Sequence, residues 1–260
     1  MRILFIGDIV GKPGRQSVQR HLPGLVAERG VDIVVANAEN AAGGLGVTPI
    51  LLDELRDFGV HAFTLGNHTW KKKELVPAID KMNDIVRPVN YPEAANGRGA
   101  AVVSGPGGAT IGLVNVIGRV YMEPVDCPLT AAVKAVEALK AETPVVLVDM
   151  HAEATAEKVA LGWYLDGKAT AVVGTHTHIQ TADERILPGG TAYITDVGMT
   201  GPTNSVIGVE TKLVLKKMLT GMPTPWNVAT GRPVLAGVLI EADAATGRAE
   251  SIERIQIFDA

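Results

Sequence analysis

The chain has little of three features that mark particular classes of protein. It has a single cysteine, Cys127, and cannot close a disulfide within itself, which is typical of proteins of the reducing cytoplasm. Only 4% of its 260 residues are aromatic, which disfavours a base-stacking surface for single-stranded nucleic acid. Its formal net charge of −4 gives no basic surface for duplex nucleic acid.

The sequence also has no apolar run close to the ~18 residues that a membrane-spanning helix needs. The apolar run at residues 3–6 is soon interrupted by Asp8, unlike the core of a secretory signal peptide. We therefore expect a cytoplasmic protein with no membrane partner. Apolar residues make up 47% of the chain, enough for a sizeable core, and no repeat or linker divides the sequence. We expect one domain spanning residues 1–260.

Short, fully apolar runs alternate with helical patterns along most of the chain, which predicts an α/β fold with buried parallel strands. Strands are expected at 2–6, 32–36, 62–65, 144–148, 169–173 and 191–195. Helices are expected at 130–141, 153–164 and 209–219, with others ending at 29, opening at Thr48-Pro49 and beginning in the charged segment 71–74. Hairpins are expected over 100–116 and 234–257.

The segment Gly-Thr-His-Thr-His at residues 174–178 follows one of these apolar runs, so its histidines stand where a buried strand ends. Extended backbone would place His176 and His178 on the same side of the chain. Two neutral imidazoles on one side form half of a transition-metal site. The alternative for an isolated pair is two loop histidines that bond to water or backbone.

Other residues with metal-ligand atoms stand in the same kind of position. Each of the following comes just past the expected end of an apolar strand: Asp8, Glu39, Asn67, His151, His176 and His178. The carboxyl ends of parallel strands share one edge of a sheet, and ligands bind there. A single polar residue after a strand is usually a turn residue or a helix cap. The repetition of the pattern predicts instead that these side chains converge.

The chemistry of this set indicates the kind of metal. Carboxylate, amide oxygen and imidazole without thiolate suit Fe, Mn, Zn, Co or Ni rather than Ca or Mg alone. The set is too large for one catalytic ion that keeps open positions. It suits two ions ~3.5–4 Å apart with a bridging carboxylate, the arrangement used on phosphate esters.

A series of blocks in the sequence resembles, in order, the signature blocks of the calcineurin-like metallophosphoesterases. The blocks are Gly7-Asp8, Asn37-Ala38-Glu39-Asn40, Gly66-Asn67-His68, His151 and Gly174-Thr175-His176-Thr177-His178. The opening segment 1–15 and the Gly-Asn-His-Thr form are similar to one branch, the YmdB-like bacterial phosphodiesterases. The resemblance covers essentially the whole chain. It implies a layered α/β sandwich with mixed sheets and a site at the carboxyl ends of the strands.

The resemblance also implies how the ligands divide between two metal ions. It assigns Asp8, Glu39, Asn40 and His178 to the first ion, and Glu39, Asn67, His151 and His176 to the second. The sequence departs from the superfamily pattern at two places, because no histidine follows in Asp8-Ile9-Val10 and because the bridging acid is Glu39 rather than an aspartate. Both departures fit the YmdB-like branch, for which iron or manganese is expected and Asn40 contributes to the first ion.

The implied reaction is hydrolysis of cyclic nucleotides, 2′,3′-cyclic ones especially, by attack of metal-bound hydroxide. His68 is next to Asn67 and free of metal in this scheme, so it is the natural general acid for the departing alkoxide. The alternative for His68 is a structural loop histidine. Glu153 and Thr155 are candidate partners for the His151 imidazole, although an acid at 153 also suits the start of a helix.

Other interpretations remain open. A phosphomonoesterase or protein phosphatase would use the same metals and would need basic residues to hold a dianion, for which Lys12 and Arg15 are the nearby candidates. A metal-dependent regulator would bind the nucleotide and sense it without significant turnover. The hairpin at 100–116 offers an edge through which two copies of the chain would pair as a homo-oligomer.

Overall fold

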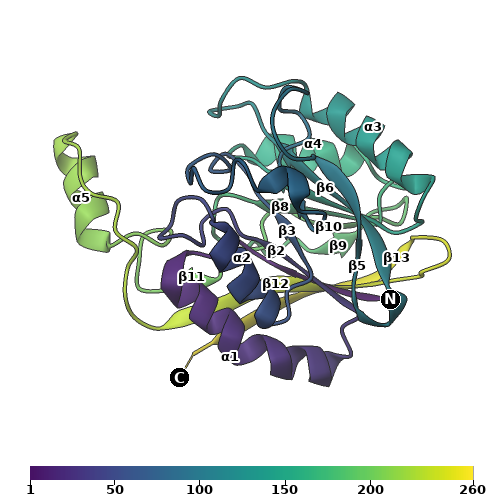
Figure 1. Ribbon diagram of the computed structural model, residues 1–260, viewed down its shortest axis with the longest axis horizontal. Coiled ribbons are helices and arrows are strands. Elements are labelled where there is room, and N and C mark those ends of the chain that lie inside the picture. The colour runs from purple at the N-terminus through teal and green to yellow at the C-terminus, as the bar shows by residue number, and fades with distance from the viewer. Residues whose placement is uncertain (260) are drawn as a thin grey trace.

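Two β-sheets form the centre of the computed structural model, which describes residues 1–259 (Figure 1). The strands of the first sheet are β1 Arg2–Ile6, β2 Ile33–Asn37, β3 Ala62–Thr64, β4 Ile85–Val86, β11 Gly201–Pro202, β12 Pro233–Ala242 and β13 Ala249–Phe258. Those of the second are β5 Ala100–Ser104, β6 Thr110–Ile117, β7 Val146–His151, β8 Ala171–Thr175, β9 Arg185–Ile186 and β10 Ala192–Ile194.

Both sheets contain parallel and antiparallel pairs. The first runs in the order β11-β12-β1-β2-β3-β4, with β13 paired to β12, and the second in the order β5-β6-β7-β8-β10-β9. The pairs β1-β2, β2-β3, β6-β7 and β7-β8 are parallel, so the carboxyl ends of β1, β2 and β3 share one edge and those of β7 and β8 another. The hairpins β5-β6 and β12-β13 are antiparallel, as expected.

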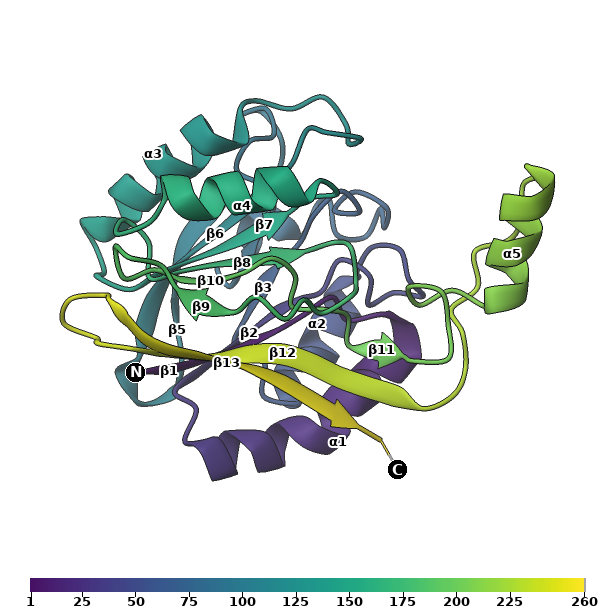
Figure 2. The ribbon, with the colours of Figure 1, turned by 180° about the vertical axis from the view of Figure 1, so that it is seen from behind.

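Helices cover the outer face of each sheet, which gives four layers (Figures 1 and 2). Helices α1 (Gly11–Arg29) and α2 (Pro49–Asp57) pack on the first sheet, and α3 (Pro128–Lys140) and α4 (Thr155–Tyr164) pack on the second. Helix α5 (Thr211–Thr220) stands away from the layers at the left of Figure 1. Within residues 1–259, no helix has both the length and the apolar character needed to cross a bilayer.

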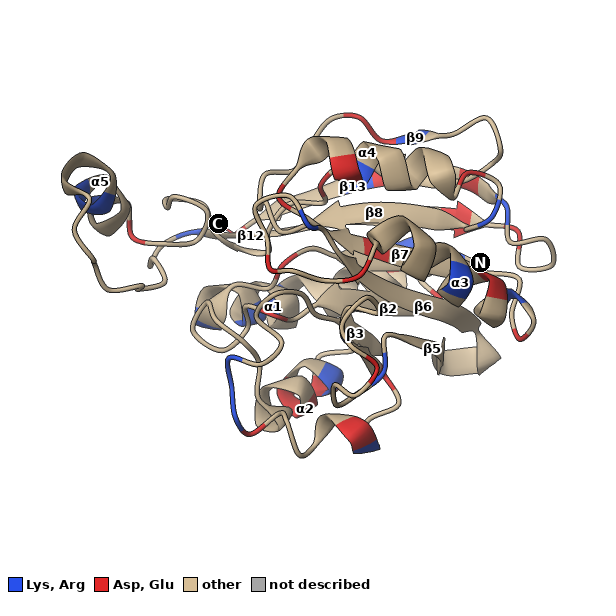
Figure 3. Cartoon of the chain, turned by 90° about the horizontal axis from the view of Figure 1, so that it is seen from above, with Lys and Arg blue, Asp and Glu red and all other residues tan. Residues whose placement is uncertain are grey.

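The apolar strands are buried on both faces. Leu4 and Ile6 of β1 pack toward α1 and α2, whereas the alternating residues Ile3 and Phe5 pack into the layer between the two sheets. A strand covered on both sides needs apolar residues at every position, which explains why the run does not alternate in polarity. Figure 3 shows the charged residues gathered on helices and loops, with the strands between them largely uncharged.

Most expected elements are confirmed, and their bounds lie within three residues of the expected ones. Helix α2 begins as predicted, because the Thr48 hydroxyl accepts a hydrogen bond from the N–H of Leu51 at 3.4 Å and Pro49 stands in the first turn. The helix expected to begin at 71–74 is wrong, since this segment forms turns. Pro77 stands three residues after this segment and lacks the N–H that a continuing helix needs. The next helical turn is the short 3₁₀ helix η1 (Ile79–Lys81).

Candidate metal centre

Strand ends from both sheets meet and bring the expected site residues together. After strands of the first sheet come Asp8 (β1), Glu39 and Asn40 (β2), and Asn67 and His68 (β3), while the second sheet supplies His151 at the end of β7 and His176 and His178 after β8. The expectation that all of them share one sheet edge is therefore corrected. Two separate edges face each other, and the side chains fill the space between them.

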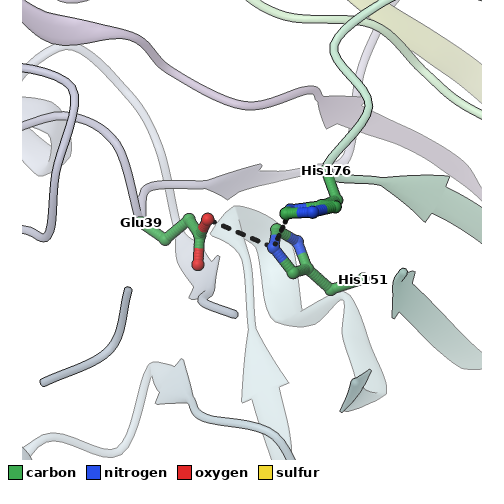
Figure 4. Close-up of side chains that lie close together, drawn as sticks. All are labelled: Glu39, His151 and His176. Carbon is green, nitrogen blue, oxygen red and sulfur yellow. Dashed lines mark hydrogen bonds and ion pairs between the residues drawn. The ribbon is translucent and has the colours of Figure 1, made fainter. Parts of the chain in front are cut away.

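The tightest part of the cluster is formed by Glu39, His151 and His176 (Figure 4). Nε2 of His151 lies 3.1 Å from Oε1 of Glu39 and 3.1 Å from Nδ1 of His176. Oδ1 of Asn67 is 3.0 Å from the same Nε2. Neighbouring ligands of an ion with bonds of ~2.1 Å are separated by roughly 3 Å, so these donor atoms have the spacing of ligands to a shared ion.

Asp8, Asn40 and His178 form the other part of the cluster. Nε2 of His178 lies 3.5 Å from Oδ1 of Asp8. The amide nitrogen of Asn40 lies 3.3 Å from each of these two atoms, and Oδ1 of Asn40 faces Nδ1 of His68 at 2.7 Å. An amide nitrogen has no lone pair to offer a metal, so Asn40 has to turn its amide group about its last side-chain bond to act as a ligand.

The backbone at the two loop histidines differs from the extended form expected. The φ angle is 89° at His176 and 66° at His178, in the region that non-glycine residues seldom occupy. The N–H of His176 donates to Oδ2 of Asp8 at 3.1 Å, and Nδ1 of His178 lies 2.9 Å from the carbonyl oxygen of Ile207. Both imidazoles therefore reach the cluster because the chain turns at each histidine.

A buried ion pair holds the residue between these histidines. Nζ of Lys158, in α4, lies 2.8 Å from Oδ2 of Asp196, which follows β10, and the two side chains are 1% and 0% exposed. The same carboxylate oxygen accepts hydrogen bonds from the N–H and the hydroxyl of Thr177 at 3.1 and 2.6 Å. Lys158 also donates to the Thr177 hydroxyl at 3.0 Å. The ion pair therefore holds the loop between His176 and His178 in place through Thr177.

Burial and neighbouring charge act in opposite directions on the pKa values of the cluster. Burial raises the pKa of Glu39 and of Asp8, but neighbouring imidazoles together outweigh it, those of His151 and His68 at Glu39 and those of His178 and His151 at Asp8. Each carboxyl therefore has a pKa below its ordinary value. Burial lowers the pKa of His151, whereas Glu39 raises it, to about 9. Burial and the adjacent His151 lower the pKa of His176 to about 3. The carboxylates are therefore ionised and His176 is neutral, which are the forms that bind metals, whereas His151 carries a proton that it has to lose in order to act as a ligand.

Residues outside the expected set support His151. The Thr175 hydroxyl lies between Nδ1 of His151 and the buried carboxylate of Asp149, which also accepts a hydrogen bond from Asn37 at 3.1 Å. A Cβ at position 66 would come within 2.4 Å of both Glu39 and His151, so only Gly66 lets these two side chains meet. The sequence did carry a signal for Asp149, because a carboxylate within an apolar strand is unusual.

A pocket of about 380 Å³ opens onto the cluster. Its polar side is lined by Glu39, Asn40, His68, Glu153, His176, Thr177 and His178, and its other side by Val10, Gly44, Ile207, Gly208, Val209 and Trp226. In the part of the chain that the structure describes, no lysine or arginine lines this pocket. Lys12 borders a different pocket, and Arg15 donates to the Ala41 carbonyl at 2.6 Å and pairs with Glu54.

Glu153 and Thr155 do not partner His151 as considered from the sequence. Oε2 of Glu153 lies 3.3 Å from Nε2 of His176, at the rim of the pocket, and Thr155 is the first residue of α4. Sequence reasoning missed Ile207 and Trp226 altogether. They belong to the segments that flank α5, which have neither a periodic pattern nor a strand end to mark them.

The sandwich of two mixed sheets, with carboxylate, amide and imidazole groups at the strand ends, defines a metallophosphoesterase of the calcineurin-like type. More narrowly, the chain belongs to the YmdB-like protein family, whose model matches residues 4–255.

Individual relatives agree with this assignment. The chain is 47% identical over 259 residues to a Bacillus subtilis (strain 168) protein named 2′,3′-cyclic-nucleotide 2′-phosphodiesterase, covering 100% of this chain and 98% of that protein. It is also similar to the crystal structure of a hypothetical protein from Thermus thermophilus, with 42% identity, a TM-score of 0.93 and full coverage of both chains. A structure from Mycoplasma pneumoniae described as a novel phosphatase gives 34% identity and a TM-score of 0.92, covering 99% of this chain and 93% of that one. These likenesses confirm the expected fold class.

Proposed function

We propose that the chain is a metal-dependent phosphodiesterase that hydrolyses 2′,3′-cyclic nucleotides. The observation that carries this proposal is the lining of the pocket. It includes Glu39, Asn40, His176 and His178 but, among residues 1–259, no lysine or arginine. A phosphate monoester carries a charge of about −1.5 to −2 near neutral pH, whereas a diester carries only one negative charge. A lining without cationic side chains therefore suits the diester better. The activity in the name of the Bacillus subtilis relative supports the same substrate class.

The donor set fits two transition-metal ions. We assign Asp8, Glu39, Asn40 and His178 to one ion and Glu39, Asn67, His151 and His176 to the other, with iron or manganese as the expected metals. When bound, such ions supply an activated water molecule and neutralise the charge of the phosphate oxygens. The carboxylates and imidazoles hold the ions, and the pocket positions the ester against them.

His68 is assigned the proton transfer to the leaving oxygen. Its Nδ1 faces the Asn40 amide at 2.7 Å and lies 3.2 Å from Oε1 of Glu39. Whichever way the Asn40 amide is turned, Nε2 is the nitrogen of His68 that is available to substrate. The N–H of His68 donates to Oε2 of Glu39 at 2.9 Å and anchors the residue at the pocket. As water adds to phosphorus, the bond to one ribose oxygen breaks, and that oxygen takes its proton from His68.

The reaction is tested with manganese-loaded and iron-loaded protein offered 2′,3′-cyclic AMP and, separately, AMP. Cleavage of the cyclic diester alone, lost in His176→Ala, is the expected result. Phosphate release from AMP would move the function to a monoesterase on the same site. Tight binding of the cyclic nucleotide with negligible turnover in the metal-loaded protein would favour the nucleotide-sensing regulator.

Metal content is measured on the same samples by inductively coupled plasma spectrometry. We expect two transition-metal ions per chain after reconstitution and a loss of metal in Glu39→Ala, because Glu39 is assigned to both ions. No more than one ion per wild-type chain, or an unchanged content in Glu39→Ala, would contradict the assignment.

Further expectations stay predictions. We propose that residues 1–260 form a single domain, since one apolar layer is shared by both sheets; Ala260 lies outside the described residues. We also propose a cytoplasmic location, in keeping with the single cysteine. The strand β5 stands at the edge of the second sheet and is the proposed contact for a second copy of the chain.

A further inference from the structure

The apolar side of the pocket is built by the two segments that connect α5 to the sandwich. Residues 206–210 lead into α5, and residues 226–229 lead away from it (Figures 1 and 2). The N–H of Glu210 donates to the carbonyl of Asn227 at 3.0 Å, and the N–H of Ala229 donates to the carbonyl of Gly208 at 2.9 Å. These hydrogen bonds hold the two segments together at the mouth of the pocket, so their side chains form a fixed wall.

Trp226 is the prominent side chain of this wall. The chain has only three tryptophans, and this one is 46% exposed although it lines the same pocket as His68 and His178. Its indole packs beside Gly44, where a Cβ would come within 3.1 Å of the ring nitrogen. The φ angle of Gly44 is 86°, a conformation that also disfavours any other residue. A large aromatic ring is thus kept open to the pocket rather than buried in the core.

The shape and polarity of the pocket match a mononucleotide. One end carries the carboxylates and imidazoles assigned to the phosphate ester, and the other is apolar and ends at an indole. Bases stack on aromatic side chains whatever their sequence, since every base has a π face. Within residues 1–259, the apolar end has no side chain with a hydrogen-bonding group other than Trp226, so nothing there reads the edge of a base.

We propose that Trp226 is the nucleobase-binding residue, with its indole stacked on the base of the bound nucleotide. The inference rests on the proposed function, because it takes the polar end of the pocket as the phosphate site. The inference adds that the base is the part of the substrate that the apolar end of the pocket recognises. The site accepts all four bases, and purines bind more tightly than pyrimidines because they offer a larger stacking area.

Binding is tested first, without turnover. Calorimetric titration of manganese-loaded protein compares 3′-AMP with ribose 3-phosphate, which lacks the base. Wild-type protein is expected to prefer the nucleotide, and Trp226→Ala is expected to lower the affinity for 3′-AMP by about 5- to 150-fold, with little change for the sugar phosphate. Trp226→Phe keeps a ring and retains most of the preference. Trp163→Ala is the matched control, since Trp163 is also exposed and does not line the pocket.

Turnover of 2′,3′-cyclic AMP is then compared with that of methyl riboside 2′,3′-cyclic phosphate, a base-free ester. In Trp226→Ala we expect KM for the nucleotide to rise while kcat, and the rate on the base-free ester, change little. An equal loss on both esters would make Trp226 a structural residue and overturn the proposal, and so would the absence of any preference for 3′-AMP in wild-type protein. A base preference without turnover of either ester would leave the base site standing and contradict the proposed function instead.

Discussion

Nδ1 of His151 lies 2.8 Å from the hydroxyl oxygen of Thr175, which donates its own proton to Oδ1 of Asp149 at 2.7 Å. All three residues are buried. Because the Thr175 proton is committed to Asp149, Nδ1 of His151 has to be the donor in the first bond. The nitrogen that faces Glu39 and Asn67 is then Nε2, and its lone pair becomes free for a metal when its proton leaves.

Thr175→Val should weaken metal binding without removing a ligand. The substitution leaves Nδ1 of His151 and the Asp149 carboxylate without their shared partner, and loss of such a supporting bond costs about 10- to 100-fold in metal affinity. Thr175→Ser keeps the hydroxyl and should bind nearly as wild type does. The metal affinity of both variants and of the wild type is measured by competition against a chromogenic chelator. Equal affinities for Thr175→Val and the wild type would show that the hydroxyl does not position His151.

His68→Ala should lose turnover while keeping its metal. Removing a general acid lowers kcat by about 10²- to 10⁴-fold, whereas the assigned ligands of both ions stay in place. The measurements are kcat on 2′,3′-cyclic AMP and metal content on the same sample. His21→Ala is the control, because His21 lies in α1 against Asp259 and away from the pocket. Loss of metal from His68→Ala would mean that His68 is a ligand rather than the proton donor.

Lys158→Met should destabilise the fold strongly, because it leaves the Asp196 carboxylate buried without its cation. Breaking a buried ion pair from one side costs about 3–5 kcal/mol in free energy of unfolding. The double variant Lys158→Met with Asp196→Leu removes both charges and should recover a large part of that loss. Urea unfolding measures the free energy of unfolding of the wild type, of Lys158→Met and of the double variant. A double variant no more stable than Lys158→Met would show that the cost comes from lost packing and not from the unpaired charge.

Stability should fall at alkaline pH through Tyr193. Burial raises the pKa of Tyr193 to about 12, above the ordinary value of 10, so the folded chain keeps the phenolic proton longer than the unfolded chain does. Its contribution is fully present below pH 10 and is lost as the pH rises toward 12, at about 1.4 kcal/mol per pH unit. Tyr193→Phe should have a shallower slope of unfolding free energy over this range. Identical slopes for the two proteins would contradict the assignment.

The apolar runs allowed the strands to be predicted because burial on both faces requires apolar side chains at nearly every position, as in β1. The strand ends were harder to place. Hydrogen bonding between strands continues through a polar residue when the strands on both sides extend past it. Asp149 stays in β7 because it pairs with Asn115 of β6 and Val173 of β8. Polarity therefore marked the end of the strand too early.

The convergence of the site residues was predictable because strand ends gather at sheet edges. The division of these residues between two sheets was not predictable, because the order of the strands along the chain does not determine which strands pair. The left-handed backbone at His176 and His178 is imposed by contacts from distant segments, such as the Asp8 carboxylate and the Ile207 carbonyl. Trp226 reaches the pocket only through the pairing of the two segments beside α5, which local sequence does not reveal.

The cluster also spans the boundary between the layers. Asp8 and Glu39 follow strands of the first sheet, and His151 and His176 belong to or follow strands of the second, so metal ions bound by all four would crosslink the two sheets of the sandwich. The free energy of unfolding would then increase as free metal rises, because a ligand that binds only the folded chain adds RT ln(1 + [M]/Kd) to its stability. A cell short of the metal would thus lose the protein as well as its activity, since metal-free chains would unfold more often and be degraded by proteases sooner.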